Sequence, residues 1–171
     1  MSYWNRYALA VDDDPQCVNT LRLMLRFCGF HHIVTAEDGF VALEYLKEWR
    51  FDLVVSDWNM GTMDGVELLM RVRRDSSTAS VPFILVTASL TEPPWRGAIE
   101  HGATEFLLKP FTLGALRSAC QLCLELKEFE GANVTTLRAS LKDRLHEDCT
   151  PSERQACAFL GAPRRFRRIG R

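Results

Sequence analysis

YALAVDDDP, residues 7–15, joins an apolar run to three consecutive carboxylates and a proline. An apolar run this short is typical of a strand buried on both faces of a parallel sheet. Pro15 after Asp14 suits the first position of a helix, because proline there loses no helical hydrogen bond. The stretch therefore predicts a buried strand that ends in carboxylates and leads directly into a helix.

The same alternation continues to about residue 128. Further short apolar runs predict strands over residues 32–36, 53–56, 81–87 and 105–108. Apolar spacing and capping residues predict helices after Asp14, over 39–49, from Asp64, from Thr91 to Gly102 and from Thr112. Five strands that alternate with five helices predict an α/β fold, a doubly wound parallel sheet with helices on both faces.

Length and composition agree with this fold class. The chain has 171 residues, a length that predicts one domain, or one domain plus an appendage. Of these residues 25% are charged and 47% hydrophobic, which is typical of a globular protein. These values exclude a fibrous chain, a wholly disordered chain and a disulfide-dominated miniprotein. No apolar run approaches the ~18 residues that a membrane span needs, and the N-terminus lacks the pattern of a secretory signal. We therefore expect a cytoplasmic protein with no membrane partner.

Gly131 marks the expected boundary between a main domain, residues 1–130, and a helical extension, residues 131–171. Val134, Leu137, Leu141 and Leu145 follow helical spacing, so this stripe either packs on the main domain or extends the preceding helix into a homodimer. The extension ends in a basic tail, because residues 164–171 hold five arginines and no acidic residue. The acidic main domain does not favour nucleic-acid binding, whereas the tail suits an anionic partner.

Polar side chains follow four of the predicted strands. Asp12 and Asp13 follow the first strand, Asp57 the third, Thr87 the fourth and Lys109 the fifth. Ligand sites of open α/β sheets lie at the carboxyl ends of the strands. If the first and third strands are neighbours, their carboxylates converge, and a hard divalent cation such as Mg²⁺ relieves their repulsion. A carboxylate in such a site can also act as a nucleophile towards phosphorus.

These residues stand in motifs that carry a family resemblance. The motifs are Ala10–Pro15, Thr35–Gly39, Val55–Met60, Met63–Gly65, Val86–Ala88 and Lys109–Phe111. With them the chain resembles the receiver domains of two-component response regulators, above all the CheY-like single-domain chemotaxis regulators, over about residues 6–128. The resemblance implies a flavodoxin-like sheet with strand order 2-1-3-4-5.

The resemblance also implies a role for each polar residue. Asp57 would accept a phosphoryl group from a sensor histidine kinase or a phosphotransfer protein. Asp12, Asp13, Asp57 and the backbone carbonyl of Asn59 would hold Mg²⁺, and Lys109 would pair with the acidic cluster. The protein would then catalyse its own phosphorylation and dephosphorylation without being a conventional enzyme.

A switch is implied as well. Thr87 would donate its hydroxyl to the phosphoryl group, and Phe106 would rotate inward into the space that Thr87 leaves. This movement would reshape the face formed by the fourth helix, the fifth strand and the fifth helix, and a protein target would read that face. The Lys109–Pro110 peptide would be cis. Two positions depart from the family pattern: Gly61 stands where proline is usual, and Phe106 lacks the hydroxyl of a tyrosine.

Two alternatives of other classes stay open at this point. The first alternative is a phosphorylation-independent scaffold. The second is the receiver of a larger transcriptional regulator, with residues 132–171 as linker. The six cysteines are expected to be free thiols, and Cys120-x-x-Cys123 is expected to pack in the core because no second pair follows at metal spacing. Trp58 is expected at the surface beside Asp57, where it would report metal binding optically.

Overall fold

The structure is a computed structural model that describes residues 3–88 and 101–128. Its strands are β1 (Tyr3–Val11), β2 (Phe30–Ala36), β3 (Leu53–Asp57), β4 (Phe83–Thr87) and β5 (Glu105–Leu108). Its helices are α1 (Pro15–Cys28), α2 (Gly39–Glu48), α3 (Gly65–Arg74) and α5 (Leu113–Glu128). The strands are parallel in the order β2-β1-β3-β4-β5, which confirms the flavodoxin-like sheet.

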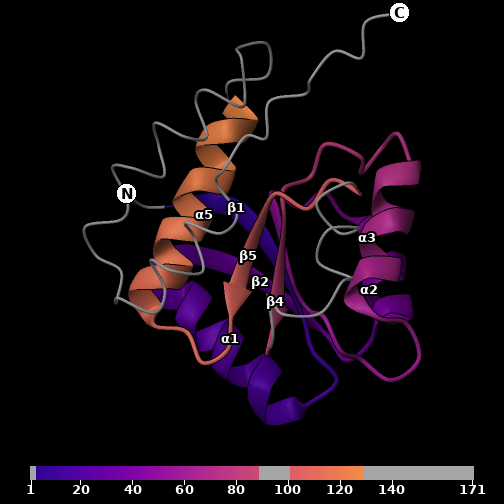
Figure 1. Cartoon of the computed structure of the whole chain (residues 1–171). Helices are drawn as coiled ribbons and strands as arrows, with labels where there is room; N and C mark the ends of the chain where they lie inside the picture. Colours follow the sequence, from indigo (N-terminus) through magenta and orange to yellow (C-terminus); the bar gives the residue numbers. More distant parts are fainter. Residues whose placement is uncertain (1–2, 89–100, 129–171) are drawn as a thin grey trace, which may run out of the picture.

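The described helices cover the sheet in two layers. Helices α1 and α5 lie on one face, and α2 and α3 lie on the other (Figure 1). Each face has its own core: Leu25, Leu116 and Cys120 belong to the first, and Leu46 and Leu69 to the second. Because both faces are covered, β3 and β4 are buried along their whole length, which explains their unbroken apolar sequences.

Aspartates that follow the strands start three of the helices. The Asp14 carboxylate accepts hydrogen bonds from the backbone N–H groups of Gln16 and Cys17, Asp38 accepts from Val41, and Asp64 accepts from Glu67. Each bond satisfies an N–H that the helix itself cannot pair. Gly29 ends α1 in the left-handed conformation, with φ 107°, which glycine adopts without steric cost. These short connections keep the residues after each strand at the same edge of the sheet.

Several boundaries differ from the predicted ones. Strand β1 begins at Tyr3 instead of Tyr7, because Tyr3 pairs with Phe30 across a shift in register that lies between Tyr3 and Tyr7. Strand β4 begins at Phe83 instead of Val81, whose backbone N–H donates to the Thr78 carbonyl in the preceding turn. The helix predicted from Thr91 and the extension 131–171 lie outside the described residues. Across 3–88 and 101–128, no helix is long and apolar enough to cross a membrane.

Candidate functional site

The sheet order brings two acidic residues together at its carboxyl edge. Strands β1 and β3 are direct neighbours with Val11 opposite Ser56, so Asp12 and Asp57 leave the sheet side by side. Both carboxylates are largely buried, with 5% of Asp12 and 8% of Asp57 exposed. The convergence expected from the sequence is therefore confirmed for these two residues.

Lys109 joins the two carboxylates. Its Nζ atom lies 2.7 Å from Oδ1 of Asp57 and 3.2 Å from Oδ2 of Asp12. Burial acts to lower the pKa of Lys109, but its ion pairs with Asp57 and Asp12 outweigh burial and raise that pKa. Burial raises the pKa of Asp12, and the hydrogen bond from Asp14 and the charge of Lys109 offset only part of that rise. The site thus keeps a fixed positive charge against two crowded carboxylates.

Backbone N–H groups orient the carboxylates further. Asn59 N–H donates to Oδ2 of Asp57 at 3.1 Å, and Asp14 N–H donates to Oδ1 of Asp12 at 3.0 Å. Asp13 is exposed, and its Oδ2 accepts from Gly61 N–H at 3.1 Å. Asp13 therefore ties the loop after β3 to the loop after β1, while Asp12 and Asp57 share Lys109.

The donor set decides whether Mg²⁺ fits here. Among the described residues, no three His, Cys, Asp or Glu side chains form a group that could hold a metal ion. Mg²⁺, however, usually takes only one or two carboxylates and completes its shell with waters and other oxygens. Asp12 and Asp57 supply two crowded carboxylates against the single positive charge of Lys109. The residues present therefore fit Mg²⁺ in its two-carboxylate mode.

Thr87 and Phe106 belong to β4 and β5, the two strands that follow β3 in the sheet. Thr87 is the last residue of β4, directly after Val86, which pairs with Asp57. Phe106 pairs with Leu85 and packs in the core on the α2 and α3 side, with 6% of its surface exposed. The ring of Phe106 is thus already buried in this structure. The Lys109–Pro110 peptide is cis, as predicted.

Gly65 is a site residue whose role the sequence reasoning missed. It is the first residue of α3, and its N–H donates to the carbonyl of Trp58 at 2.8 Å. A Cβ atom at this position would overlap the backbone carbonyl of Asp57 and lie 2.8 Å from Cδ2 of Leu85. Only glycine lets α3 begin so close to Asp57. The one signal in the sequence is the Asp64-Gly65 pair at the start of a predicted helix.

A cleft of about 540 Å³ opens beside the two carboxylates. Asp12, Asp57 and Lys109 line one end of it, and Cys17, Thr20, Leu21, Met24 and Phe111 are among the residues that line the rest. The buried carboxylates are therefore reachable from solvent along α1. A reactant of moderate size can approach Asp57 from this side.

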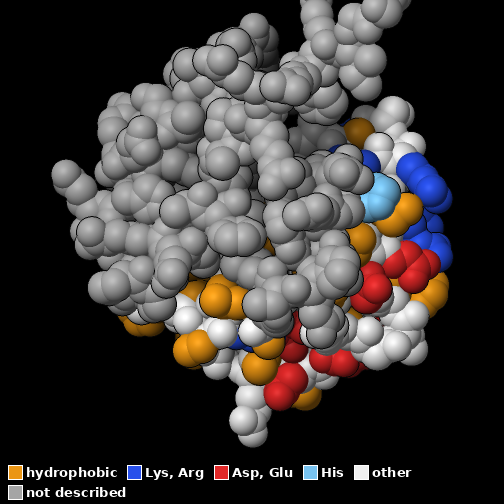
Figure 2. Space-filling model, viewed as in Figure 1, with side chains coloured by type: hydrophobic (Ala, Val, Ile, Leu, Met, Phe, Trp, Pro, Cys, Tyr) orange, Lys and Arg blue, Asp and Glu red, His pale blue; other side chains and the backbone are white. Residues whose placement is uncertain are grey.

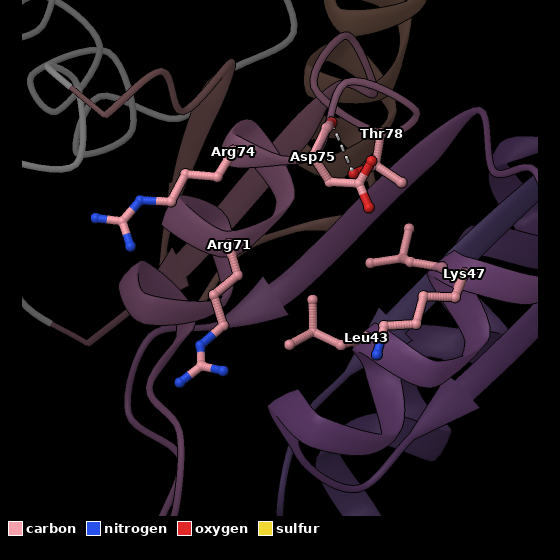
Figure 3. A pocket seen from close by; sticks show the side chains of 7 residues that line it. Leu43, Lys47, Arg71, Arg74, Asp75 and Thr78 are labelled. Carbon is pink, nitrogen blue, oxygen red and sulfur yellow. Dashed lines mark hydrogen bonds between the residues drawn. The ribbon is translucent and has the colours of Figure 1, made fainter.

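A second pocket, of about 470 Å³, lies between α2 and α3 (Figure 3). Lys47, Arg71 and Arg74 line it, and each is in the last turn of its helix, where a cation stabilises the negative end of the helix dipole. Figure 2 shows basic and acidic side chains on the side of the molecule where α2 and α3 lie. The positions of these three basic side chains are thus explained by helix stability.

Known proteins have similar sequences. The sequence model of the family described as response regulator receiver domain matches residues 8–121. Chemotaxis protein CheY-3 of Vibrio cholerae is 35% identical over 113 residues, which cover 66% of this chain and 87% of that protein. Chemotaxis protein CheY of Pseudomonas aeruginosa is 34% identical over 117 residues, which cover 68% and 94% of the two chains.

Solved structures agree with these sequence matches. Chemotaxis protein CheY4 of Vibrio cholerae, crystallised at low pH, is similar with a TM-score of 0.64 and 33% identity over 70% of this chain and 98% of that chain. The receiver domain of a Pseudomonas aeruginosa sensor histidine kinase, described with a magnesium ion in its active-site cleft, has a TM-score of 0.66 and 24% identity. That alignment covers 71% of this chain and 99% of the other, and at this identity it shows the fold.

Proposed function

This chain belongs to the response regulator receiver domains of two-component systems and is CheY-like, and we propose that it signals by accepting a phosphoryl group on Asp57. Receiver domains interact with histidine kinases or phosphotransfer proteins, so the donor is a phosphohistidine on such a protein. The observation that carries the proposal is the contact between Lys109 Nζ and Asp57 Oδ1, 2.7 Å apart at the open cleft.

The proposed step is a phosphoryl transfer between two proteins. One carboxylate oxygen of Asp57 forms a bond to phosphorus while the bond from phosphorus to the donor's histidine nitrogen breaks. The bonding electron pair leaves with that nitrogen, and Asp57 becomes an acyl phosphate. Such a reaction needs positioning and neutralisation of charge more than covalent help from the protein. Lys109 supplies a positive charge next to the attacking oxygen, and Asn59 N–H orients the other oxygen.

The proposed cofactor is Mg²⁺, which supplies positive charge to the oxygens of the transferred group when it is bound. Asp12, Asp57 and the backbone carbonyl of Asn59 are the proposed ligands. Asp13 is proposed as a further ligand, and its bond to Gly61 N–H would have to coexist with that role or break. The crowding of Asp12 and Asp57, together with the pKa of Asp12 raised by its burial, supports the need for a cation here.

Thr87 and Phe106 are proposed to carry the signal away from Asp57. Thr87 directly follows Val86, which pairs with Asp57. Thr87 therefore lies at the same end of the sheet as a phosphoryl group on Asp57. Since the Phe106 ring is buried here, the proposed switch has to stabilise this inward position against an outward one. The changed surface along β5 and α5 would contact a protein target, as expected for a chain that signals by protein contact.

The test is the intact mass of the full chain after incubation with acetyl phosphate, a small phosphodonor that needs no kinase. Wild type with Mg²⁺ is expected to gain one phosphoryl group, and wild type with a chelator is expected to gain none. Asp57→Asn is expected to gain none under either condition. Asp38→Asn is the matched control, since it also turns a carboxylate into an amide, and asparagine caps a helix as well as aspartate does.

Two results would overturn the proposal. Modification of Asp57→Asn to the level of the wild type would show that another residue accepts the group. Folded wild type that stays unmodified with Mg²⁺, and in which Mg²⁺ does not change Trp58 fluorescence, would favour a phosphorylation-independent interaction module. The decay of the modified mass after removal of the donor then measures self-catalysed dephosphorylation.

A further inference from the structure

Two buried leucines of α5 lie outside both hydrophobic cores. Leu122 is 3% exposed and Leu126 is 9% exposed, so both side chains are shielded from solvent. The core between α1, α5 and the sheet includes Leu116 and Cys120 of the same helix. As the described residues define the two cores, neither Leu122 nor Leu126 belongs to one of them. The burial of these leucines therefore requires a cover that neither core supplies.

The two leucines face away from α1. Arg117 marks the side of α5 that faces α1, because its Nη2 donates to the carbonyl of Phe27 at 3.2 Å. An α-helix has 3.6 residues per turn, so Leu122 lies about 140° and Leu126 about 180° round the helix axis from Arg117. Helix α1 is therefore on the wrong side of α5 to cover these side chains.

Two alanines continue the same side of α5 into an apolar row. Positions 115, 119, 122 and 126 follow one another at intervals of four, three and four residues, which places them along one face of a helix. Ala115 and Ala119 are buried as well. We call Ala115, Ala119, Leu122 and Leu126 the α5 flank. A continuous apolar row of this kind is typical of a helix surface that packs against another helix.

The sequence that follows α5 carries a matching row. Its members have helical spacing and are Val134, Leu137, Leu141 and Leu145. This row spans as many positions as the α5 flank does, so in a helix each row is about 17 Å long at 1.5 Å per residue. Helix α5 ends at Glu128, which leaves residues 129–133 as a connection. Connections of about 2–8 residues are usual between antiparallel neighbouring helices, and Gly131 suits such a turn.

We propose that residues 134–145 form a helix that packs antiparallel against the α5 flank of the same chain. In this arrangement Val134 lies opposite Leu126, and Leu145 lies opposite Ala115. The large side chain of Leu145 then meets the small one of Ala115, as close packing of two helices requires. An isolated helix of this length is marginal in water, so burial of its apolar row against α5 supplies the stability that it lacks alone.

The docked segment shields part of α5 from other proteins. The proposed protein target contacts the surface along β5 and α5, so the segment and the target compete for α5. This consequence rests on the proposed function, whereas the docking itself needs no phosphoryl group. Because the segment belongs to the same chain, it competes at a high effective concentration, which a target has to overcome.

Hydrogen exchange of α5 in the full chain tests the docking, with peptide mass spectrometry as the readout and no phosphodonor present. Leu137→Asp/Leu141→Asp places two charges in the row. Thr136→Asp/Ser140→Asp is the matched control, because it adds the same two charges at the same interval on another side of the proposed helix. Amides of residues 115–126 are expected to exchange at least about tenfold faster in the first variant, since burial of one leucine alone is worth that factor. The control is expected to exchange as the wild type does.

A cross-link gives a second reading that does not depend on the charged variants. Ala115→Cys/Leu145→Cys is expected to form a disulfide between the two introduced thiols in air, because the antiparallel arrangement places them opposite each other. Ala115→Cys/Val134→Cys is the control, since Val134 then lies at the other end of α5, and it is expected to form none. Peptide mass spectrometry after iodoacetamide separates these links from any that involve the six native cysteines.

Three results would overturn the proposal. The first is equal exchange of α5 in the charged variant and its control, which would mean that another segment covers the flank. The second is an equal yield of the two designed disulfides. The third is protection of α5 in the wild type that rises with protein concentration, because a second copy would then be the cover. None of these readings involves phosphorylation of Asp57, so failure of the proposed function and failure of the docking are distinguishable.

Discussion

The Nζ atom of Lys109 lies 2.7 Å from Oδ1 of Asp57. Asp57 ends β3 and Lys109 follows β5, and β4 lies between these two strands in the sheet. The side chain of Lys109 spans the end of β4 to reach this position. A charge held in this way is part of the site before any reactant arrives, so it costs no reorganisation during a reaction.

Removal of that charge is expected to slow phosphorylation. In Lys109→Met the rate of phosphoryl gain from acetyl phosphate with Mg²⁺ should fall by about 100-fold, because one preorganised charge at the reacting oxygens is lost. Lys127→Met is the matched control, since Lys127 forms a comparable ion pair with Asp52 at 3.1 Å and its side chain is 29% exposed, against 32% for Lys109. Equal rates in the two variants would contradict the role of Lys109.

Asp12→Asn is expected to stabilise the protein in the absence of metal. The Asp12 side chain is 7% exposed and its pKa is raised by burial, so its charge destabilises the folded state. The amide oxygen of asparagine can still accept the hydrogen bond from Asp14 N–H. Urea unfolding in chelator should show a gain of about 0.5–2 kcal/mol, the usual size of the effect of one stabilising substitution.

Urea unfolding of the wild type and Asp12→Asn in Mg²⁺ tests whether Asp12 helps to bind the metal. Added Mg²⁺ should stabilise the wild type more than Asp12→Asn, because binding to the folded state adds to its stability. Asp38→Asn, an exchange of one helix cap for another, should respond to Mg²⁺ as the wild type does. A loss of stability in Asp12→Asn without metal would mean that the pair with Lys109 outweighs the burial of the charge.

Gly65→Ala is expected to damage both the fold and the site. The added methyl group would overlap the Asp57 carbonyl, so α3 or the end of β3 has to move. Overpacking of this kind costs about 1–3 kcal/mol in unfolding free energy, and it should also lower the phosphorylation rate. Gly61→Ala is the control in the same loop, because there the nearest atom to an added Cβ is Oδ2 of Asp13 at 3.9 Å. Similar losses in both variants would argue against a specific role of Gly65.

Trp58 is expected to report metal binding. It directly follows Asp57 and is partly exposed, and its backbone N–H donates to the Val86 carbonyl at 2.7 Å. Titration with Mg²⁺ should change the fluorescence of the wild type, and Trp58→Phe should remove that change. Asp57→Asn should weaken the apparent affinity by at least about tenfold. Sodium chloride at matched ionic strength is the control, and an equal response to it would mean that Trp58 senses ionic strength only.

The sequence predicted the fold well because the strands are continuous apolar runs and the helices have strong caps. The meeting of Asp12 and Asp57 at the carboxyl ends of the strands could be expected too, since each of them directly follows such a run. The early start of β1 could not, because Asn5 and Arg6 interrupt the apolar pattern before Tyr7 and the pairing of Tyr3 with Phe30 is a long-range contact. Local periodicity carries no information on such pairing.

Other features depend on distances that no pattern contains. The close approach of Gly65 to the Asp57 backbone appears only when α3 is docked on the sheet. From the sequence, Cys120 and Cys123 could be assigned to the core, which their complete burial confirms.

The hydrogen bond from Lys109 Nζ to Oδ2 of Asp12 spans 97 positions of the chain, from the first strand to the loop after the last. Protein synthesis proceeds from the N-terminus, so a ribosome has made Asp12 and Asp57 long before it adds Lys109. A nascent chain that ends before Lys109 lacks the charge that completes the site. An unfinished chain is therefore expected to accept a phosphoryl group on Asp57 more slowly than a chain that includes Lys109.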